Sequence, residues 1–187
     1  MTKKKIAQTE EPESFGKSVL QVLGMTAIIL VIWYFVFSLV LSNDRVFGPS
    51  MQPTFEKDDR LISIRQFTPA RNDIVVLKAP DAPNALYIKR IVGLPGDRIV
   101  AKNDRMYING KLYTEPYLNN HFKQADHATG KNYTFNFKVT VPKGYYWVMG
   151  DHRDISNDSR YFGPVKRSSL LSQVKLRYWP ITQIAFF

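Results

Sequence analysis

An uncharged stretch from Ser18 to Asn43 constrains this chain more than any other feature of its sequence. Between Val22 and Leu41 nearly every residue is apolar, and about 20 such residues in a helix cross the roughly 30 Å hydrocarbon core of a bilayer. A cleaved secretory signal peptide is the alternative, but its apolar region would be about 7–15 residues long and would end at a small-residue cleavage site. This run is longer and continues into Ser-Asn-Asp-Arg. It therefore predicts a retained transmembrane anchor.

The orientation of this anchor follows from its position more than from its flanking charges. Basic residues precede the stretch and also follow it closely, so the positive-inside bias is slight. The preceding tail is short and basic, however, and large domains after a span translocate largely regardless of charge. We therefore expect residues 1–17 to form a cytoplasmic tail, residues 18–43 to form the anchor, and the rest of the chain to lie outside.

The residues after the anchor are numerous enough for one domain with its own core. The chain has no cysteine, which excludes disulfides, thiolate metal sites and a cysteine nucleophile. Its net charge is +10, and most of this charge lies beyond the first 17 residues, so a tethered domain would be drawn toward anionic lipid headgroups. The lysines and arginines are scattered in the sequence, and we predict no nucleic-acid partner.

The pattern after the anchor is mainly β. Short runs rich in β-branched residues, bounded by Pro, Gly, Asn and Asp, predict strands at 60–65, 73–77, 86–92 and 174–179. Asn109 and Gly110 predict the tip of a hairpin across residues 106–113, since both tolerate the positive φ of a primed turn. A second hairpin is predicted from 135–141 and 145–149, and the polar segment 118–131 is predicted to be an irregular loop.

Histidine-based and metal-based sites are not supported by the sequence. None of the three histidines has the spacing of a zinc-binding helix. Asp151 and His152 are adjacent, and neighbouring side chains on a strand face opposite sides, so they cannot form a triad pair. Asp154 and Asp158 complete an acidic group, but an EF-hand loop would need Glu at Phe162. We predict no metal site.

Ser50 lies in the segment Gly-Pro-Ser-Met-Gln-Pro, where glycine gives conformational freedom and the prolines fix φ. Such a turn can present a hydroxyl and aim backbone N–H groups at one point, as an oxyanion hole requires. A loop that only links anchor to domain has the same composition, and spacing alone favours that interpretation.

Lys89 changes this balance. It lies in the predicted strand 86–92, and the two-residue period puts the apolar Tyr87 and Ile91 beside it on the same face. On such a dry surface desolvation lowers the pKa of a lysine and allows it to act as a base. A lysine whose stem packs while its amine reaches water is the more common arrangement and stays open.

Four segments resemble, in this order, the sequence boxes of bacterial type I signal peptidases: Ser50–Thr54, Arg71–Val75, Tyr87–Asp97 and Gly150–Gly163. Together with the anchor, the resemblance covers nearly the whole chain. Some members of the family have a serine at the position of Gly48. The glycine and the absence of cysteine resemble the Gram-positive form.

The resemblance implies a membrane-bound serine endopeptidase that cleaves signal peptides from exported preproteins through an acyl-enzyme, without a cofactor. By motif position, Ser50 would be the nucleophile and Lys89 the general base. Ser156 would hydrogen-bond the lysine amine and orient it. Asp158 and Arg160 would form a supporting ion pair beneath the site.

The same resemblance implies how the substrate is held. Val46 and Ile88 would help line shallow pockets for small side chains at −3 and −1, which reject larger ones by overpacking. Gly48 would offer only its backbone to the oxyanion hole, so the Ser50 N–H would carry the stabilisation. His152 and Ile155 stand where the family often has asparagine, and we expect local repacking there.

The fold implied is a transmembrane helix followed by a β-rich catalytic core, at 44–102 and 141–187, with a smaller β subdomain inserted at 103–140. The expected partners are signal peptides and membrane lipid, and the expected location is the outer face of the bacterial cytoplasmic membrane. No sequence feature predicts an oligomeric state.

Two other classes of protein stay open. A Ser/Lys self-cleaving regulator resembles the same catalytic core, but it would be cytosolic and carry a DNA-binding module, and the anchor argues against it. The other class is a catalytically inactive, membrane-anchored β domain with a binding or scaffolding role.

Overall fold

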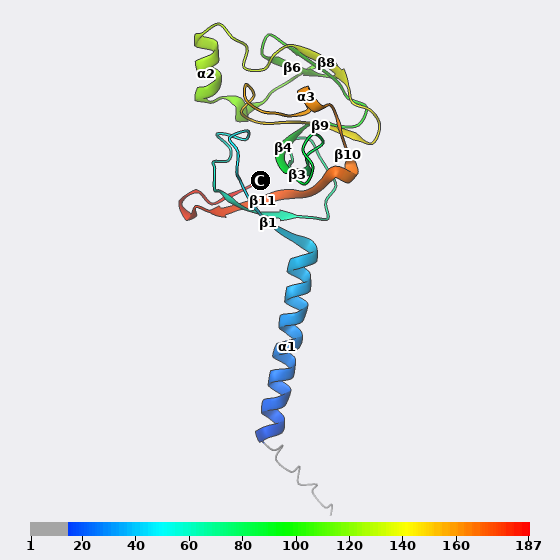
Figure 1. The fold of residues 1–187 in the computed structure, drawn as a ribbon, viewed down its shortest axis with the longest axis vertical. Helices are drawn as coiled ribbons and strands as arrows, with labels where there is room; N and C mark the ends of the chain where they lie inside the picture. The colour runs from blue at the N-terminus through cyan, green and yellow to red at the C-terminus, as the bar shows by residue number, and fades with distance from the viewer. Residues whose placement is uncertain (1–14) are drawn as a thin grey trace, which may run out of the picture. The chain divides into compact units, whose positions relative to one another are not determined.

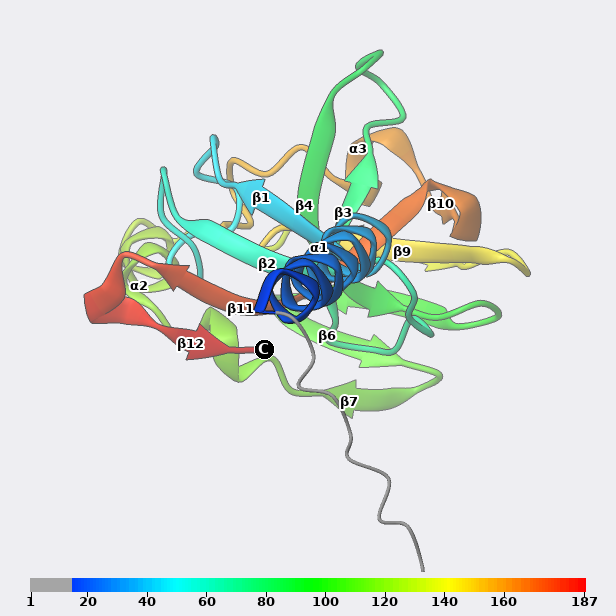
Figure 2. The ribbon, with the colours of Figure 1, turned by 90° about the horizontal axis from the view of Figure 1, so that it is seen from below.

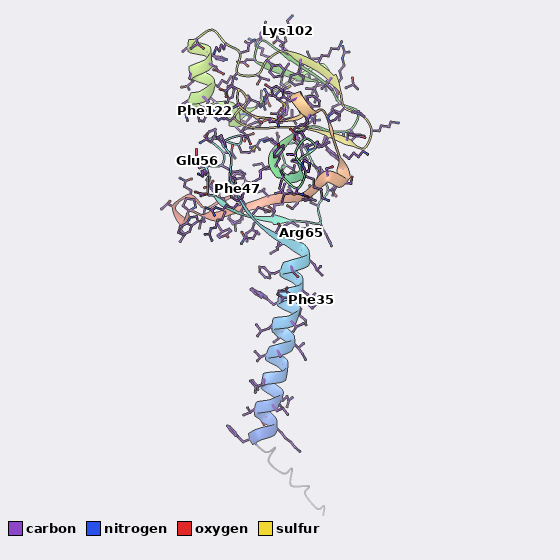
Figure 3. The ribbon with its side chains drawn as sticks, viewed as in Figure 1. Phe35, Phe47, Glu56, Arg65, Lys102 and Phe122 are labelled. Atoms are coloured by element: carbon purple, nitrogen blue, oxygen red, sulfur yellow. The ribbon has the colours of Figure 1, made fainter. Side chains whose placement is uncertain are left out.

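The computed structural model describes residues 15–187, so most of the predicted tail at 1–17 lies outside the described residues. The chain divides into two compact units between Leu39 and Val40. The first contains all of the helix α1 (Phe15–Val40) but its last residue, and no side chain of this helix is buried. Figure 3 shows the α1 side chains, Phe35 among them, projecting from the helix. Within residues 15–187, α1 is the one helix long and apolar enough to cross a membrane.

The end of the predicted anchor differs from the observed helix. Residues 41–43 of the uncharged stretch belong to strand β1 (Leu41–Arg45), which pairs with β2 (Arg60–Ile64). Leu41 lies opposite Ile64 in this antiparallel pair. The apolar composition continues across the boundary, so composition alone does not mark where the helix ends.

An antiparallel sheet of eight strands forms the larger part of the second unit. Its order is β1-β2-β11-β3-β4-β9-β10, and β12 pairs with β11. Besides β1 and β2 it contains β3 (Ile74–Lys78), β4 (Leu86–Gly93), β9 (Tyr145–Met149), β10 (Val165–Lys166), β11 (Leu170–Trp179) and β12 (Ala185–Phe186). Strand β3 lies in the middle and is buried on both faces, as its continuous Ile-Val-Val-Leu run predicts.

A second antiparallel sheet of four strands has the order β7-β6-β5-β8. Its strands are β5 (Arg98–Lys102), β6 (Arg105–Ile108), β7 (Lys111–Tyr113) and β8 (Phe137–Thr140). The predicted hairpin at 106–113 is confirmed, with Asn109 at φ 53° and Gly110 at φ 79° in the turn between β6 and β7. This small sheet begins at Arg98, ahead of the predicted start of the inserted subdomain at residue 103.

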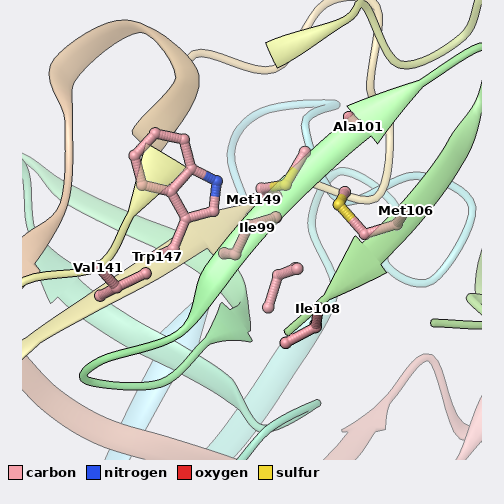
Figure 4. Close-up of a cluster of buried hydrophobic side chains, with 8 residues drawn as sticks. Ile99, Ala101, Met106, Ile108, Val141, Trp147 and Met149 are labelled. Atoms are coloured by element: carbon pink, nitrogen blue, oxygen red, sulfur yellow. The ribbon is translucent and has the colours of Figure 1, made fainter. Parts of the chain in front are cut away.

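A shared apolar core joins the two sheets. Trp147 and Met149 of β9 pack with Ile99 of β5 and Met106 of β6 in one buried cluster. Figure 4 shows these side chains meeting between the strands. Within the second unit, β1 and β11 lie at one end and the small sheet lies at the other, with β3, β4 and β9 between them (Figure 1). Figure 2 shows β1, β2 and β11 side by side, as their pairing requires.

The prediction of an irregular loop at 118–131 is wrong. This segment contains α2 (His121–Ala128), which follows the short 3-10 helix η1 (Pro116–Leu118). The side chain of Asn120 accepts hydrogen bonds from the backbone N–H groups of Phe122 and Lys123 and so caps the helix. α2 has no buried residue, and for that reason its sequence lacks the apolar period that marks most helices.

The second predicted hairpin is also wrong. Both strands exist, but β8 pairs with β5 and β9 pairs with β4 and β10. The turn between them still forms, since Tyr145 N–H donates to the carbonyl of Pro142. It carries the chain from one sheet to the other, because the apolar side chains of β8 and β9 pack face to face in the shared core. The remaining elements are α3 (Ser159–Phe162), η2 (Arg167–Ser169) and η3 (Ile181–Gln183).

Candidate active site

The loop that carries Ser50 is fixed to the core by the residues that follow the serine. The backbone N–H of Gln52 donates to Pro49 and that of Phe55 donates to Met51. Met51 and Phe55 are almost fully buried, so the turn cannot move away from the domain without exposing them. The Ser50 N–H donates to no backbone carbonyl within residues 15–187.

Lys89 lies on β4 with only 3% of its surface exposed. Its Nζ lies 2.7 Å from Ser50 Oγ and donates a hydrogen bond to it. The amine also lies 5.2 Å from the centre of the Tyr87 ring, on the same face of the strand. The predicted dry environment of this lysine is therefore present. The fold brings Lys89 and Ser50 together although they are far apart in the sequence.

Burial determines the protonation of this amine. Desolvation lowers the pKa of Lys89 to about 8, although the carboxylates of Asp158 and Asp151 act in the opposite direction. A substantial fraction of the amine is then neutral at mildly alkaline pH. A neutral amine 2.7 Å from a hydroxyl can accept its proton.

Asp158 and Arg160 form a buried ion pair, with Nε of Arg160 2.8 Å from Oδ1 of Asp158. Burial alone raises the pKa of Asp158, but the hydrogen bonds and charge of Arg160 outweigh it and hold the pKa below its usual range. The other carboxylate oxygen accepts from the backbone N–H of Gly150, and Arg160 donates to the carbonyl of Arg153. The pair therefore fixes the loop after β9.

The hydrogen bond predicted between Ser156 and the Lys89 amine is not formed. Ser156 Oγ is buried and makes no hydrogen bond of normal geometry within residues 15–187, although it lies near enough to the Asp158 carboxylate to help hold the pKa of Asp158 down. A Cβ atom added at Gly150 would lie 2.2 Å from Ser156 Oγ and 2.4 Å from the carbonyl oxygen of Ser50. Ser156 is thus close to the nucleophile loop, on the other side of Gly150, but it does not orient the amine in this arrangement.

Two residues that hold the nucleophile loop were not identified from the sequence as doing so. Asp151 receives two hydrogen bonds from Arg90 of β4 and one from Thr54, so it ties the loop to the strand that carries Lys89. The backbone N–H of His152 donates to the carbonyl of Ser50, and its ring contacts the Pro49 carbonyl at 3.3 Å. Both lie in the fourth motif, where the sequence suggested for His152 only local repacking and for neither residue a contact with the nucleophile loop.

A cavity of about 320 Å³ opens beside the Ser50 hydroxyl. It brings together residues that the motifs predicted and others that they did not: Arg45, Val46, Phe47, Gly48, Ser50, Met51, Leu86, Tyr87, Ile88, Lys89, Ile155 and Asn157. Val46 is buried and Gly48 has open space where a side chain would be, so the floor is apolar and the rim next to the nucleophile is unobstructed. The cavity can receive an extended peptide with small side chains.

Comparison with known proteins identifies the family. Residues 17–179 match the family model described as signal peptidase, peptidase S26. The chain is 34% identical to signal peptidase IB of Staphylococcus aureus over 91% of its own length and 94% of that protein. It is 36% identical to signal peptidase I of Streptococcus pneumoniae, covering 78% of this chain and 86% of that protein.

A solved structure agrees with these matches. The crystal structure of a signal peptidase I from Enterococcus faecalis superposes with a TM-score of 0.52 at 36% identity, over 57% of this chain and 97% of that one. The predicted β-rich signal-peptidase fold and the resemblance to Gram-positive forms are therefore confirmed. The chain belongs to the peptidase S26 family and is a serine peptidase of the signal peptidase I type.

Proposed function

We propose that this chain is a membrane-anchored endopeptidase that cleaves signal peptides from exported preproteins, with Ser50 as nucleophile and Lys89 as general base. One observation supports this assignment above all others: the buried Lys89 Nζ lies 2.7 Å from Ser50 Oγ. In this pair a serine hydroxyl is hydrogen-bonded to a lysine amine whose pKa is lowered to about 8. Both residues line the same cavity.

In this mechanism the neutral Lys89 amine takes the proton of the Ser50 hydroxyl while Oγ attacks the carbonyl carbon of the −1 residue. The Ser50 N–H stabilises the resulting oxyanion, and Gly48 can offer only its backbone. When the C–N bond breaks, the Lys89 ammonium gives its proton to the leaving amine. Lys89 then accepts a proton from the water that hydrolyses the ester on Ser50, and the hydroxyl is restored.

Specificity for small residues at −3 and −1 follows from the cavity. Val46 and Ile88 line it together with the two reacting groups. Val46 is almost fully buried and cannot withdraw to admit a larger side chain. A bulky residue would therefore be rejected by overpacking.

The anchor and topology belong to the same proposal. α1 is uncovered by protein along its apolar length, and a bilayer would satisfy such a surface. The tail at 1–17 would be cytoplasmic and the anchor at 18–43 would cross the membrane. The core at 44–102 and 141–187, with the subdomain at 103–140, would lie on the outer face near membrane lipid.

The dyad is tested with the full chain in detergent and a preprotein substrate. We expect Ser50→Ala and Lys89→Ala each to lower kcat by at least about 10³-fold, because a nucleophile and its base act as one unit. Ser168→Ala and Lys166→Ala, at exposed positions, are the matched controls and should leave kcat unchanged. Full activity of either dyad variant would refute the assignment. It would also favour the alternative of an inactive binding or scaffolding domain. No contact among residues 15–187 supports that alternative.

A further inference from the structure

The small sheet has one face turned to the core and one turned to solvent. Ile99 and Ala101 of β5 and Met106 and Ile108 of β6 are buried against the large sheet. Because side chains alternate along a strand, the residues between them point to the opposite side, which we call the outer face. It carries four cations: Arg98, Lys102, Arg105 and Lys138.

The outer face has no compensating negative charge. Within residues 15–187, none of its four cations forms a salt bridge, and no acidic residue alternates onto this side of β5, β6 or β8. The nearest carboxylates in the sequence, Asp97 and Asp104, are mostly buried and contact Arg71 and His127. Residues from three strands thus form a concentrated positive surface.

One pair on this face opposes the stability of the sheet. Lys102 of β5 lies directly opposite Arg105 of β6 in the antiparallel register. Like charges in directly opposite positions destabilise a sheet, and one acidic residue at either position would remove the repulsion. Local rules are most often broken where a surface has a function. The repulsion would be relieved by a negatively charged partner lying across both strands.

Apolar side chains run through the middle of the cations. Val100 lies opposite Tyr107, and Tyr107 lies opposite Leu112 of β7, which is 59% exposed. Two hollows of about 510 and 430 Å³ share Tyr107, one bounded by Arg98 and the other by Lys102. A partner that fits this face therefore carries acidic groups and apolar side chains together.

The position of the face identifies the kind of partner. Figure 3 shows Lys102 and Arg65 at opposite ends of the domain. The backbone N–H of Arg65 donates to Val40, the first residue of the domain, so the chain enters at the end away from the outer face. A lipid surface at the entry end does not reach Lys102. A phosphate polymer would match the charges but leave Val100 and Tyr107 uncovered.

We propose that the outer face binds an extended acidic polypeptide segment whose inward-facing side chains, at every second residue, are alternately acidic and apolar. Along β5, Arg98 and Lys102 are four residues apart, about 13 Å in a strand. Carboxylates four residues apart in an extended peptide have the same spacing. Apolar residues of the segment would cover Val100 and Tyr107.

The proposal is tested by the binding of a fluorescent Glu–Leu peptide with the repeat Glu-Ser-Leu-Ser, which puts Glu and Leu on the same side of an extended chain, to the full chain in uncharged detergent. We expect Lys102→Glu/Arg105→Glu to weaken binding at least about tenfold, and salt to weaken binding to the parent, because charge attraction is screened. Tyr107→Thr should weaken binding without changing the charge. The control Lys78→Glu/Lys166→Glu makes the same charge change at exposed positions of the large sheet and should bind like the parent.

Cleavage of a short signal-peptide substrate should be unchanged in Lys102→Glu/Arg105→Glu, which separates this surface from the Ser50 site. Three results would overturn the proposal. The outer-face variant binds the peptide like the parent, or the control variant loses as much affinity. The third is that polyphosphate, or nanodiscs containing phosphatidylglycerol, bind to the outer face while the Glu–Leu peptide does not.

Discussion

At the scale of single residues, the site depends on close approaches that leave no room for extra atoms. Gly150 lies between the carbonyl of Ser50 and the hydroxyl of Ser156, and a Cβ atom there would come within 2.4 Å of the first and 2.2 Å of the second. The Ser156 hydroxyl can rotate away, but the Cβ of Ser156 would still lie 2.6 Å from the added atom, and the Ser50 carbonyl belongs to a backbone held by His152. A side chain at position 150 must therefore shift the backbone of Ser50, which carries the nucleophile, or that of Ser156.

We expect Gly150→Ala to lower kcat/KM by about 10²-fold, since displacing a reacting group by about 1 Å costs that much. Steady-state cleavage of a peptide substrate measures the effect, and thermal unfolding checks that the variant is folded. Gly16→Ala, where a Cβ meets nothing within 4 Å, is the control. A Gly150→Ala enzyme that is folded and as active as the parent would show that the close approach has no role.

The sequence predicted part of this residue-level arrangement. The period of strand 86–92 predicted that Lys89 lies against a dry surface, and it is buried. Its contact with Ser50, 39 residues away, came from the resemblance and not from the period, because a period carries no information about which distant loop covers a strand. The unpaired hydroxyl of Ser156 depends on side-chain rotation, which no motif specifies.

At the scale of elements, the helix α2 is marked in the sequence by its N-cap, Asn120, and not by an apolar period. α2 has no buried residue, so it depends on its N-cap more than a core helix does. We expect Asn120→Ala to lower the free energy of unfolding by about 1 kcal/mol, because two backbone N–H groups lose their acceptor. Chemical denaturation of the full chain in detergent measures this change.

Asn119→Ala is the matched control, since Asn119 is exposed and lies outside α2. Equal losses in the two variants would mean that the cap contributes nothing specific.

The wrong prediction of a hairpin between β8 and β9 has a different origin. Side chains of β8 and β9 alternate between the two faces of a strand, as the sequence predicted. Which strands they pair with depends on packing in the core shared between the sheets, around Trp147 and Ile99. Such long-range packing is invisible in a local pattern.

At the scale of the whole molecule, the proposed topology puts the two ends of the chain on opposite sides of a membrane. The absence of native cysteine makes this directly measurable, because any introduced thiol is the only one present. In intact cells, we expect Lys143→Cys to react with a membrane-impermeant maleimide and Lys5→Cys to react only after lysis. Labelling of Lys5→Cys in intact cells with protection of Lys143→Cys would reverse the topology.

The four ordered motifs predicted the family and the β-rich fold, and both were confirmed by the comparisons. The gathering of Arg98, Lys102, Arg105 and Lys138 on one face was not predicted, because the sequence does not show that β8 pairs with β5 or which side of these strands faces solvent. Three strands bring these cations together, and only their register shows it.

If buried Lys89 is the base for Ser50, the pH dependence of kcat/KM for a peptide substrate reports the protonation of its amine. Only the neutral amine can accept the hydroxyl proton, so activity should rise with pH through an apparent pKa of about 8. Below that value, each pH unit should lower kcat/KM about tenfold. A rising limb near 10.4, the value of an unburied lysine, would contradict the account.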